Sequence, residues 1–397
     1  LGHEYVKPVT VFFRARCMFA GLISRERPVS AWCEPDAVLA ALAPYSLQAP
    51  RDIWAGDRQL LVQVATRNGA QSAGICRHAD SGVAVAFWGR LDNRSDLIGQ
   101  LGAELTASDD ELIALAWLKW GEHCPERLVG DFALAVASPK TGAVFLARDV
   151  MGVKPLFYRA DADGVFFANS AAAFKPLKLG ALTPDRDWMA RFLLEVSYSH
   201  DGTAYRELKK LPPAHGLLIT ADGRISLRRY HQFRDDAAFE TRRDVRYLDA
   251  YRSVWREAVA CRMPATGPMG SENSGGLDSG SVTAEIARQL GDDANRHRMY
   301  GFGFAFDERE PQAIMAVAKH SRMANQFLSA GMEAEPPEGW AARELRIAGY
   351  PNEHANGTSH ALFYEECRLH GIGTLFSGFG GDEGVTVSGL SLRRELF

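Results

Sequence analysis

The sequence Ser274-Gly275-Gly276-Leu277-Asp278-Ser279 decides the fold of the second half of this chain. An apolar pattern follows it at Val282, Ile286 and Leu290, spaced four residues apart, and predicts a helix that ends at Gly291. Paired glycines before a helix let backbone N–H groups turn inward, and the helix adds the positive end of its dipole. The stretch therefore predicts an anion-binding loop between a strand and a helix.

The polar side chains of this loop suit the phosphates of a nucleotide. Ser274 and Ser279 can donate hydrogen bonds to phosphate oxygens. Asp278 would repel phosphate unless a cation bridged the two, so we interpret it as a magnesium ligand. The loop is not a Walker A motif, because the chain contains no GxxxxGK[ST]. Taken alone, a glycine-rich turn with a capping Ser or Asp explains the hexapeptide equally well.

A second glycine-rich loop, SGFGGDE at 377–383, follows a short apolar run at 373–376 that predicts a buried strand. It again offers backbone donors together with an acid, Asp382. Two such loops can hold the phosphates and magnesium of a nucleotide from both sides, with Asp278 and Asp382 as metal ligands. Strands and helices alternate after residue 247, which indicates a doubly wound parallel sheet with ligands beyond the carboxyl ends of its strands.

The first half has a different pattern, in which short β-type runs are separated by turns. Apolar runs at 132–137 and 144–147 flank a Pro/Gly turn and predict a hairpin, and GVFFA at 164–168 predicts a third strand. A capping box that starts at Ser108 predicts a helix ending at Trp120. This half therefore mixes sheet and helix, in layers.

Length and composition describe a globular protein of more than one domain. The chain has 397 residues, of which 46% are hydrophobic and 24% charged. The charge-dense stretch 232–246 predicts the boundary between domains at 17–231 and 247–397.

Several function classes are excluded by the same composition. The net charge is −4 with no broad basic field, so we expect no nucleic-acid partner. No apolar run is long enough for a transmembrane helix, and the first residues lack the basic-then-apolar order of a signal peptide. We therefore expect no membrane contact and a cytoplasmic location. The six cysteines are widely spread without a CxxC pair, which favours reduced thiols over a zinc site.

The two glycine loops, in this order, resemble the synthetase domain of the asparagine synthetase B family. Segments 126–133, 148–158 and 208–215 of the first half resemble the same family. The resemblance runs from about residue 17 to the end of the chain. It implies an N-terminal αββα Ntn-hydrolase-like (glutaminase-like) domain at 17–231. It also implies a C-terminal PP-loop synthetase domain at 247–397 that uses ATP and Mg2+.

The resemblance also assigns roles to single residues. The SGGLDS loop would bind the pyrophosphate part of ATP, the second loop would approach the AMP part, and a phenylalanine on the second strand would flank adenine. The implied cofactor-binding residues are Ser274, Gly275, Gly276, Asp278, Ser279, Phe302, Ser377 and Gly378. The implied catalytic and metal-binding residues are Asp278 and Asp382.

The first domain departs from the family where glutamine hydrolysis needs specific residues. The family's nucleophile is a cysteine directly after the initiator methionine, and its free amine is the base. Ala20 stands at that position here, and Cys17 lies out of register behind 16 residues. Trp88 and Arg90 replace the Asn and Glu of the glutamine-binding segment, whereas Asp109 matches the family's glutamine-binding acid. We therefore expect no glutamine hydrolysis, and a structural or docking role for this domain.

The second domain departs too. Phe379 stands where asparagine synthetases have an acid and β-lactam synthetases a tyrosine, and it can neither take a proton nor bind an amine by charge. Lasso-peptide cyclases are similar, with an aromatic in this loop and a segment like 384–389 after it. Residues 268–273 replace an apolar strand of the family and are a poor strand by propensity. The chain ends at Phe397, where the family continues through a long helical segment, so we expect a truncated domain.

The sequence therefore predicts an AMP-forming, ATP-dependent amide ligase, closest in pattern to a lasso-peptide cyclase. Such an enzyme adenylates an Asp or Glu side chain of a precursor peptide, and the peptide's N-terminal amine displaces AMP. The expected partners are the precursor peptide and its leader-processing protease, and a homo-oligomer is left open. A glutamine-hydrolysing asparagine synthetase and a non-catalytic scaffold homologue remain as alternatives.

Overall fold

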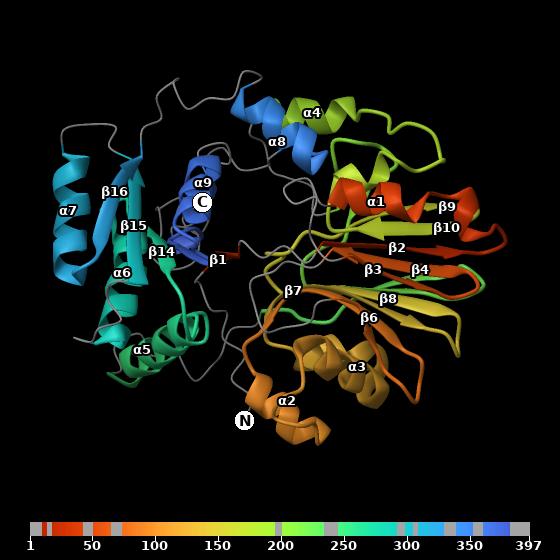
Figure 1. Ribbon diagram of the computed structural model, residues 1–397, viewed down its shortest axis with the longest axis horizontal. Coiled ribbons are helices and arrows are strands. Elements are labelled where there is room, and N and C mark those ends of the chain that lie inside the picture. Colours follow the sequence, from red (N-terminus) through yellow and green to blue (C-terminus); the bar gives the residue numbers. More distant parts are fainter. Residues whose placement is uncertain are drawn as a thin grey trace, which may run out of the picture. The chain divides into compact units, whose positions relative to one another are not determined.

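The computed structural model describes residues 10–13, 18–42, 51–64, 74–194, 201–233, 245–291, 298–304, 309–328, 339–351 and 360–381. The chain divides into two compact units. The sandwich unit comprises Ala15–Phe233 and Ala341–His354. The parallel-sheet unit comprises Leu1–Arg14, Arg234–Trp340 and Ala355–Phe397. Each unit has sheets of its own (Figure 1).

The sandwich unit contains two six-stranded antiparallel sheets, in the orders β11-β9-β10-β2-β4-β3 and β13-β12-β8-β7-β6-β5. Its strands are β2 (Met18–Ser24), β3 (Arg51–Ala55), β4 (Gln59–Val64), β5 (Cys76–Arg77), β6 (Ala84–Leu91), β7 (Gly130–Ser138), β8 (Ala143–Arg148), β9 (Phe157–Asp161), β10 (Gly164–Ala168), β11 (Lys209–Lys210), β12 (His215–Ile219) and β13 (Ile225–Arg229). Its helices are α1 (Pro35–Leu42), α2 (Arg94–Leu101), α3 (Asp109–Trp120) and α4 (Arg186–Leu193), together with most of α8 (Trp340–Ala348).

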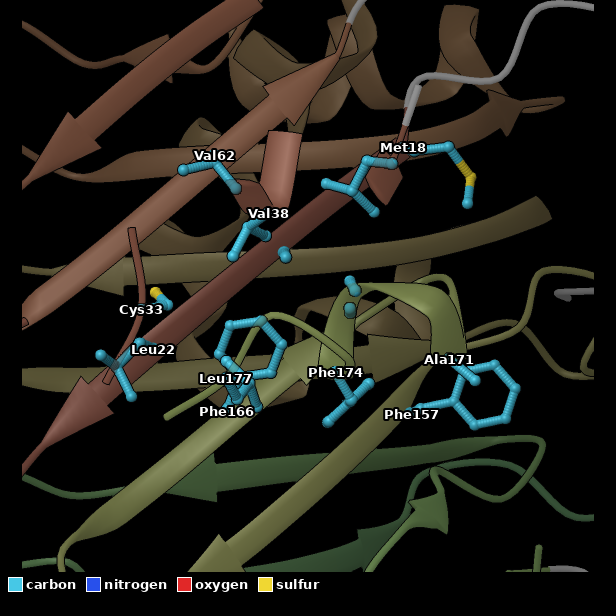
Figure 2. Close-up of a cluster of buried hydrophobic side chains, with 14 of the residues drawn as sticks. Met18, Leu22, Cys33, Val38, Val62, Phe157, Phe166, Ala171, Phe174 and Leu177 are labelled. Carbon is cyan, nitrogen blue, oxygen red and sulfur yellow. The ribbon is translucent and has the colours of Figure 1, made fainter. Parts of the chain in front are cut away.

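Alternating side chains along the strands build the layers of this unit. Phe19 of β2 packs between the two sheets, whereas its neighbour Ala20 faces the layer that holds α1. Figure 2 shows the α1 layer, where Leu22, Val62 and Phe166 of the sheet meet Val38. The outer face of the second sheet packs against α2 and α3. The order helix, sheet, sheet, helix is the αββα architecture that the resemblance implies for this half.

The local elements predicted for the first half are present. Strands β7 and β8 form the antiparallel hairpin, and β10 is the predicted third strand. The capping box is complete, because Glu111 N donates to Ser108 Oγ at 3.4 Å and Ser108 N donates to Glu111 Oε2 at 2.6 Å. These elements form where the sequence places them because their signals are local.

Residues Ala341–His354 lie with the sandwich unit, although they follow the predicted domain boundary. Ser170 Oγ donates to the carbonyl oxygen of Ala348, and Tyr205 Oη donates to that of Gly349, each at 3.1 Å. The ring of Tyr350 lies 5.3 Å from that of Phe157. A fragment cut at the boundary would therefore expose the surface that this segment covers.

The segment at 148–154 is a turn held by its own polar side chains. The Arg148 guanidinium donates to the carbonyl oxygens of Gly152, Lys154 and Leu211 at 2.5, 2.8 and 2.8 Å. The Asp149 carboxylate accepts the backbone N–H groups of Met151, Val153 and Lys154. The charged pair that opens this motif therefore has a structural role.

Ala214 holds a backbone conformation that favours glycine, with φ at +59°. The turn is fixed, because Ala214 N donates to the Asp149 carbonyl oxygen at 3.0 Å and Tyr230 N donates to the Ala214 carbonyl oxygen at 2.8 Å. The left-handed region costs a residue with a Cβ about 1–2 kcal/mol, and a glycine loses part of this gain through its larger unfolded-state entropy. We expect Ala214→Gly to raise the free energy of unfolding by about 0.5–1 kcal/mol.

Urea unfolding followed by tryptophan fluorescence measures this change. Ala160→Gly is the matched control, because Ala160 is exposed on β9 and lacks a positive φ. The control should lower the free energy of unfolding. An equal loss of stability in both variants would contradict the strain assigned to Ala214.

The parallel-sheet unit contains a five-stranded sheet in the order β1-β17-β14-β15-β16. Strands β14 to β17 are mutually parallel, and β1 pairs antiparallel with β17 at one edge. The strands are β1 (Thr10–Phe13), β14 (Met269–Glu272), β15 (Met299–Phe304), β16 (Ala324–Leu328) and β17 (Thr374–Ser377). The helices are α5 (Val245–Ala260), α6 (Leu277–Leu290), α7 (Glu310–Ser321) and α9 (His360–Leu369).

Helices cover both faces of this sheet (Figure 1). One face packs on α5, α6 and α7 through a cluster that includes Met269, Ile286 and Phe376. The other face packs on α9 through a cluster that includes Phe302 and Phe363. This is the doubly wound parallel sheet that the sequence predicts. Within the described ranges, no helix is both long and apolar enough to cross a membrane.

Strand β14 corrects one expectation. Residues 268–273 are a poor strand by propensity, yet Met269–Glu272 forms the central strand of the sheet. Parallel partners hold it on both sides, which overrides the intrinsic preference of its residues. A Cβ on Gly270 would lie 3.0 Å from Leu375 Cδ1 and 3.1 Å from Phe302 Cε2, so a small residue suits this crowded position.

Candidate nucleotide site

The SGGLDS loop joins β14 to α6, and a buried asparagine fixes its start. Asn273 Nδ2 donates to the Ile314 carbonyl oxygen at 3.0 Å and to Asn325 Oδ1 at 2.9 Å, while its Oδ1 accepts the Gly275 N–H at 3.2 Å. Gly275 has φ at +72°, and a Cβ there would lie 2.6 Å from Ala313 Cβ. Only glycine fits this turn.

The serines of the loop bond to one another. Ser274 Oγ lies 2.9 Å from Ser279 Oγ, and Gly276 N donates to Ser274 Oγ at 3.2 Å. Gly276 is the N-cap of α6, so Asp278 lies in the first turn of that helix. The N–H groups of a first helical turn have no partner within the helix, and they attract anions. The loop therefore has the geometry of a phosphate-binding helix start.

The second glycine loop meets the first at Asp278 and Ser279. A Cβ on Gly378 would lie 2.5 Å from Ser279 N, and one on Gly381 would overlap Asp278 Cγ. Both loops follow the carboxyl ends of adjacent parallel strands, β14 and β17. The structure thus brings together all the predicted loop residues that it describes, from Ser274 to Ser279 and at Ser377 and Gly378.

Two predicted residues remain, of which Phe302 does not join this group. Asp382 lies outside the described residues. Phe302 is 0% exposed and packs among Phe363, Leu375 and their neighbours, so its ring has no face open to adenine in this structure. Among the described residues, no group of three or more His, Cys, Asp or Glu could hold a metal ion. The Asp278 carboxylate lies at the contact of the two loops, beside Gly381.

Glu272 belongs to this edge of the sheet but was missed by sequence reasoning. It ends β14, and Ser377 Oγ donates to its Oε2 at 2.5 Å. Phe379 N in turn donates to Ser377 Oγ at 3.1 Å. Burial raises the pKa of Glu272 to about 7, and the hydrogen bond from Ser377 opposes that shift. The available signal was a carboxyl residue within a segment that is apolar in the family.

In the sandwich unit, the side chains at the positions that match the family's glutamine-binding segment pair with neighbouring side chains. Arg90 is buried, and its guanidinium nitrogens lie 2.5 Å from Asp92 Oδ1 and 3.1 Å from Asp131 Oδ2. Lys154 Nζ lies 4.9 Å from the centre of the Trp88 ring. A cation over an aromatic face is attractive, so this contact also holds its partners in place.

Ala20 and Asp109 are likewise part of the packed interior. Ala20 is 0% exposed in β2, and Cys17 lies outside the described residues. Asp109 is 1% exposed; it pairs with Arg94 and accepts the Leu91 N–H at 3.2 Å. Its carboxylate is therefore engaged by the protein itself.

Comparisons with known proteins agree with this arrangement. A glutamine amidotransferase domain model matches residues 49–231, and an asparagine synthase model matches residues 250–395. The glutamine-hydrolyzing asparagine synthetase 3 of Bacillus subtilis is 28% identical over 224 residues, which cover 55% of this chain and 36% of that protein. Asparagine synthetase 1 of the same organism is 23% identical over 346 residues, which cover 86% of this chain and 52% of that protein.

Amidase chyE of Penicillium rubens is 26% identical over 322 residues, which cover 77% of this chain and 47% of that protein. The chain thus spans about half or less of the length of these relatives. Both domain models match in the order expected, and the two glycine loops meet at the carboxyl edge of the parallel sheet. The chain belongs to the asparagine synthetase-like family.

Proposed function

We propose that this chain belongs to an ATP-dependent, AMP-forming amide ligase. The observation that carries the proposal is the contact between the two glycine loops, at Gly378 with Ser279 and at Gly381 with Asp278. A carboxylate is a poor electrophile, and hydroxide is a poor leaving group. The substrate carboxylate would attack the α-phosphate of ATP to give an acyl-AMP and pyrophosphate, and an amine would then displace AMP.

The residues of the two loops divide this work. Ser274, Ser279 and the first-turn N–H groups of α6 would hold the pyrophosphate, because a helix start favours negative charge. Ser377 and Gly378, at the end of β17, would face the AMP part. Mg2+, held by Asp278 and Asp382, would offset the charge that builds up on the phosphates.

We further propose that the substrate is a precursor peptide, whose N-terminal amine attacks its own adenylated Asp or Glu side chain. Two observations support this macrolactam closure. Phe379 is 42% exposed on the second loop, so an apolar ring stands where relatives would recognise a small amine. The salt bridges of Arg90 occupy the glutamine position, so no ammonia source is expected. An amine on the same peptide as the activated carboxylate needs no binding step of its own, because the peptide already holds the two groups together.

The test uses the complete protein with ATP, Mg2+ and a panel of Asp- and Glu-containing peptides. ATP–pyrophosphate exchange with a peptide, followed by loss of one water by mass spectrometry and an equal amount of AMP, is the expected result. Asparagine made from free aspartate and ammonia, with every peptide unchanged, would identify an asparagine synthetase instead. No exchange with any carboxylate would identify a scaffold.

We expect no glutaminase activity, either from the unmodified chain or after Ala20→Cys. The new thiol would lie in a fully buried strand and would have no free N-terminal amine as its base. Arg90 and Trp88 would still close the glutamine position. Release of glutamate from glutamine is the measurement, with a glutamine-hydrolyzing relative assayed in parallel. Glutamate above background from Ala20→Cys would show that the pocket is still functional.

A further inference from the structure

Glu272 lies between the two glycine loops, on the face of the sheet that α9 covers. Its neighbour Ser271 faces the other side, where Ser271 Oγ lies 2.8 Å from Thr283 Oγ1 of α6. Because side chains alternate along a strand, Glu272 faces α9, where His360 Nε2 lies 3.9 Å from Glu272 Oε1. Its side chain is 15% exposed. The carboxyl group thus lies in a mostly closed space at the carboxyl edge of β14.

The two carboxyl oxygens of Glu272 differ in their partners. Ser377 Oγ donates to Oε2 at 2.5 Å, whereas Oε1 is buried and accepts no hydrogen bond from the part of the chain that the structure describes. His360 at 3.9 Å is beyond hydrogen-bond distance. A buried acceptor without a donor costs about 1–3 kcal/mol, and such a group calls for a specific explanation. An acceptor of this kind, beside two loops suited to a nucleotide, points to a donor on a ligand.

The surroundings of Glu272 suit proton transfer near neutral pH. Burial raises its pKa to about 7, close to the value at which a general base is most effective. The ionisable side chain that faces it within ion-pair distance, among the described residues, is His360 of α9. The flanking strands β15 and β17 present Phe302 and Ser377, which carry no charge. Phe379 of the second loop cannot accept a proton, so another residue must.

We propose that Glu272 Oε1 binds the attacking amine and takes its proton in the second half-reaction. The inference rests on the proposed ligase function and adds a catalytic residue to it. The amine enters uncharged, and its nitrogen bonds to the carbonyl carbon of the acyl-AMP as Glu272 accepts one of its hydrogens as a proton. The carbon–oxygen bond to AMP breaks, and its electron pair leaves with AMP. Ser377 positions the carboxylate by donating to Oε2.

The test separates the two half-reactions in the complete enzyme carrying Glu272→Gln. A peptide chosen from the panel by ATP–pyrophosphate exchange supplies the carboxylate, and hydroxylamine serves as a probe that traps acyl-AMP without an enzymic base. We expect exchange and hydroxamate formation within about threefold of the unmodified enzyme. We expect closure of the peptide to fall by about a hundredfold or more, the usual contribution of a general base.

The pH profile provides a second readout that a purely structural role would not change. Peptide closure by the unmodified enzyme should rise with pH as Glu272 ionises near 7 and as the attacking α-amino group loses its charge near a pKa of about 7.7–8.0, and it should then level off. Closure by Glu272→Gln should keep rising with pH, since hydroxide becomes the acceptor. Glu272→Ala should regain closure with added formate. The control is Glu365→Gln, on the same helix as His360, where the exposed carboxylate pairs with Arg368 at 2.5 Å. This variant should keep the exchange rate, the closure rate and the pH profile of the unmodified enzyme.

Three outcomes overturn the inference. Equal losses of exchange and closure in Glu272→Gln would mean that Glu272 serves nucleotide binding or adenylation, and the ligase function would stand. Closure at the unmodified rate would mean that Glu272 takes no proton. No exchange by the unmodified enzyme with any carboxylate would remove the ligase function, and this inference with it.

Discussion

Asp278→Asn is expected to lower ATP–pyrophosphate exchange by about a hundredfold or more, because a metal ion at the phosphates contributes several kcal/mol of stabilisation. The amide keeps the size of the side chain but removes the charge that holds a hard cation. Asp278 lies in the first turn of α6, beside Gly381 of the second loop. The fold should survive, since the loss of a first-turn acid costs only about 0.3–1 kcal/mol.

Exchange measured over a range of Mg2+ concentrations checks this result, with circular dichroism to confirm folding. Asp249→Asn is the control, because Asp249 is 69% exposed on α5 and pairs loosely with Arg252 at 3.8 Å. The control should behave as the unmodified chain does. A folded Asp278→Asn protein with normal exchange at ordinary Mg2+ would remove the metal role assigned to this residue.

The parts of the fold that could be predicted from the sequence are those with local signals. The spacing of Val282, Ile286 and Leu290 predicts α6, and Gly291 ends the helix as expected. The capping box at Ser108 forms because both its partners lie within one helical turn. Strand β14 could not be predicted in this way, since parallel neighbours on both sides, and not its own residues, make it a strand.

The candidate site divides in the same way, into features with local sequence signals and features that depend on packing between distant segments. Both glycine loops could be predicted, because their residue types alone indicate backbone donors near a helix start. Their contact could not, since it depends on how β14 and β17 align in the sheet. Glu272 was missed for the reason that β14 was missed, because without a strand there was no face on which to place its side chain. Phe302 was assigned by resemblance, and its burial depends on packing that no motif encodes.

Gly378→Ala is expected to impair adenylation about as strongly as the loss of Asp278. The new Cβ would lie 2.5 Å from Ser279 N and 2.9 Å from the Asp278 carbonyl carbon. Both are backbone atoms, so no side-chain rotation can relieve the clash and the loops must separate. A misplacement of about 1 Å in a site that depends on orientation can cost about a hundredfold in rate. Overpacking of this kind should also lower the free energy of unfolding by about 1–3 kcal/mol.

Gly373→Ala is the matched control, because a Cβ at Gly373, just before β17, would have no atom of the described residues within 4 Å. It makes the same chemical change just before the strand that Gly378 follows, without pushing on α6. Exchange at saturating ATP, measured well below the unfolding transition of each variant, separates a displaced loop from lost folding. If Gly378→Ala kept normal exchange, the two loops would not act as a pair. Since their contact is the observation that supports a nucleotide site at this edge, the ligase function would lose its structural basis.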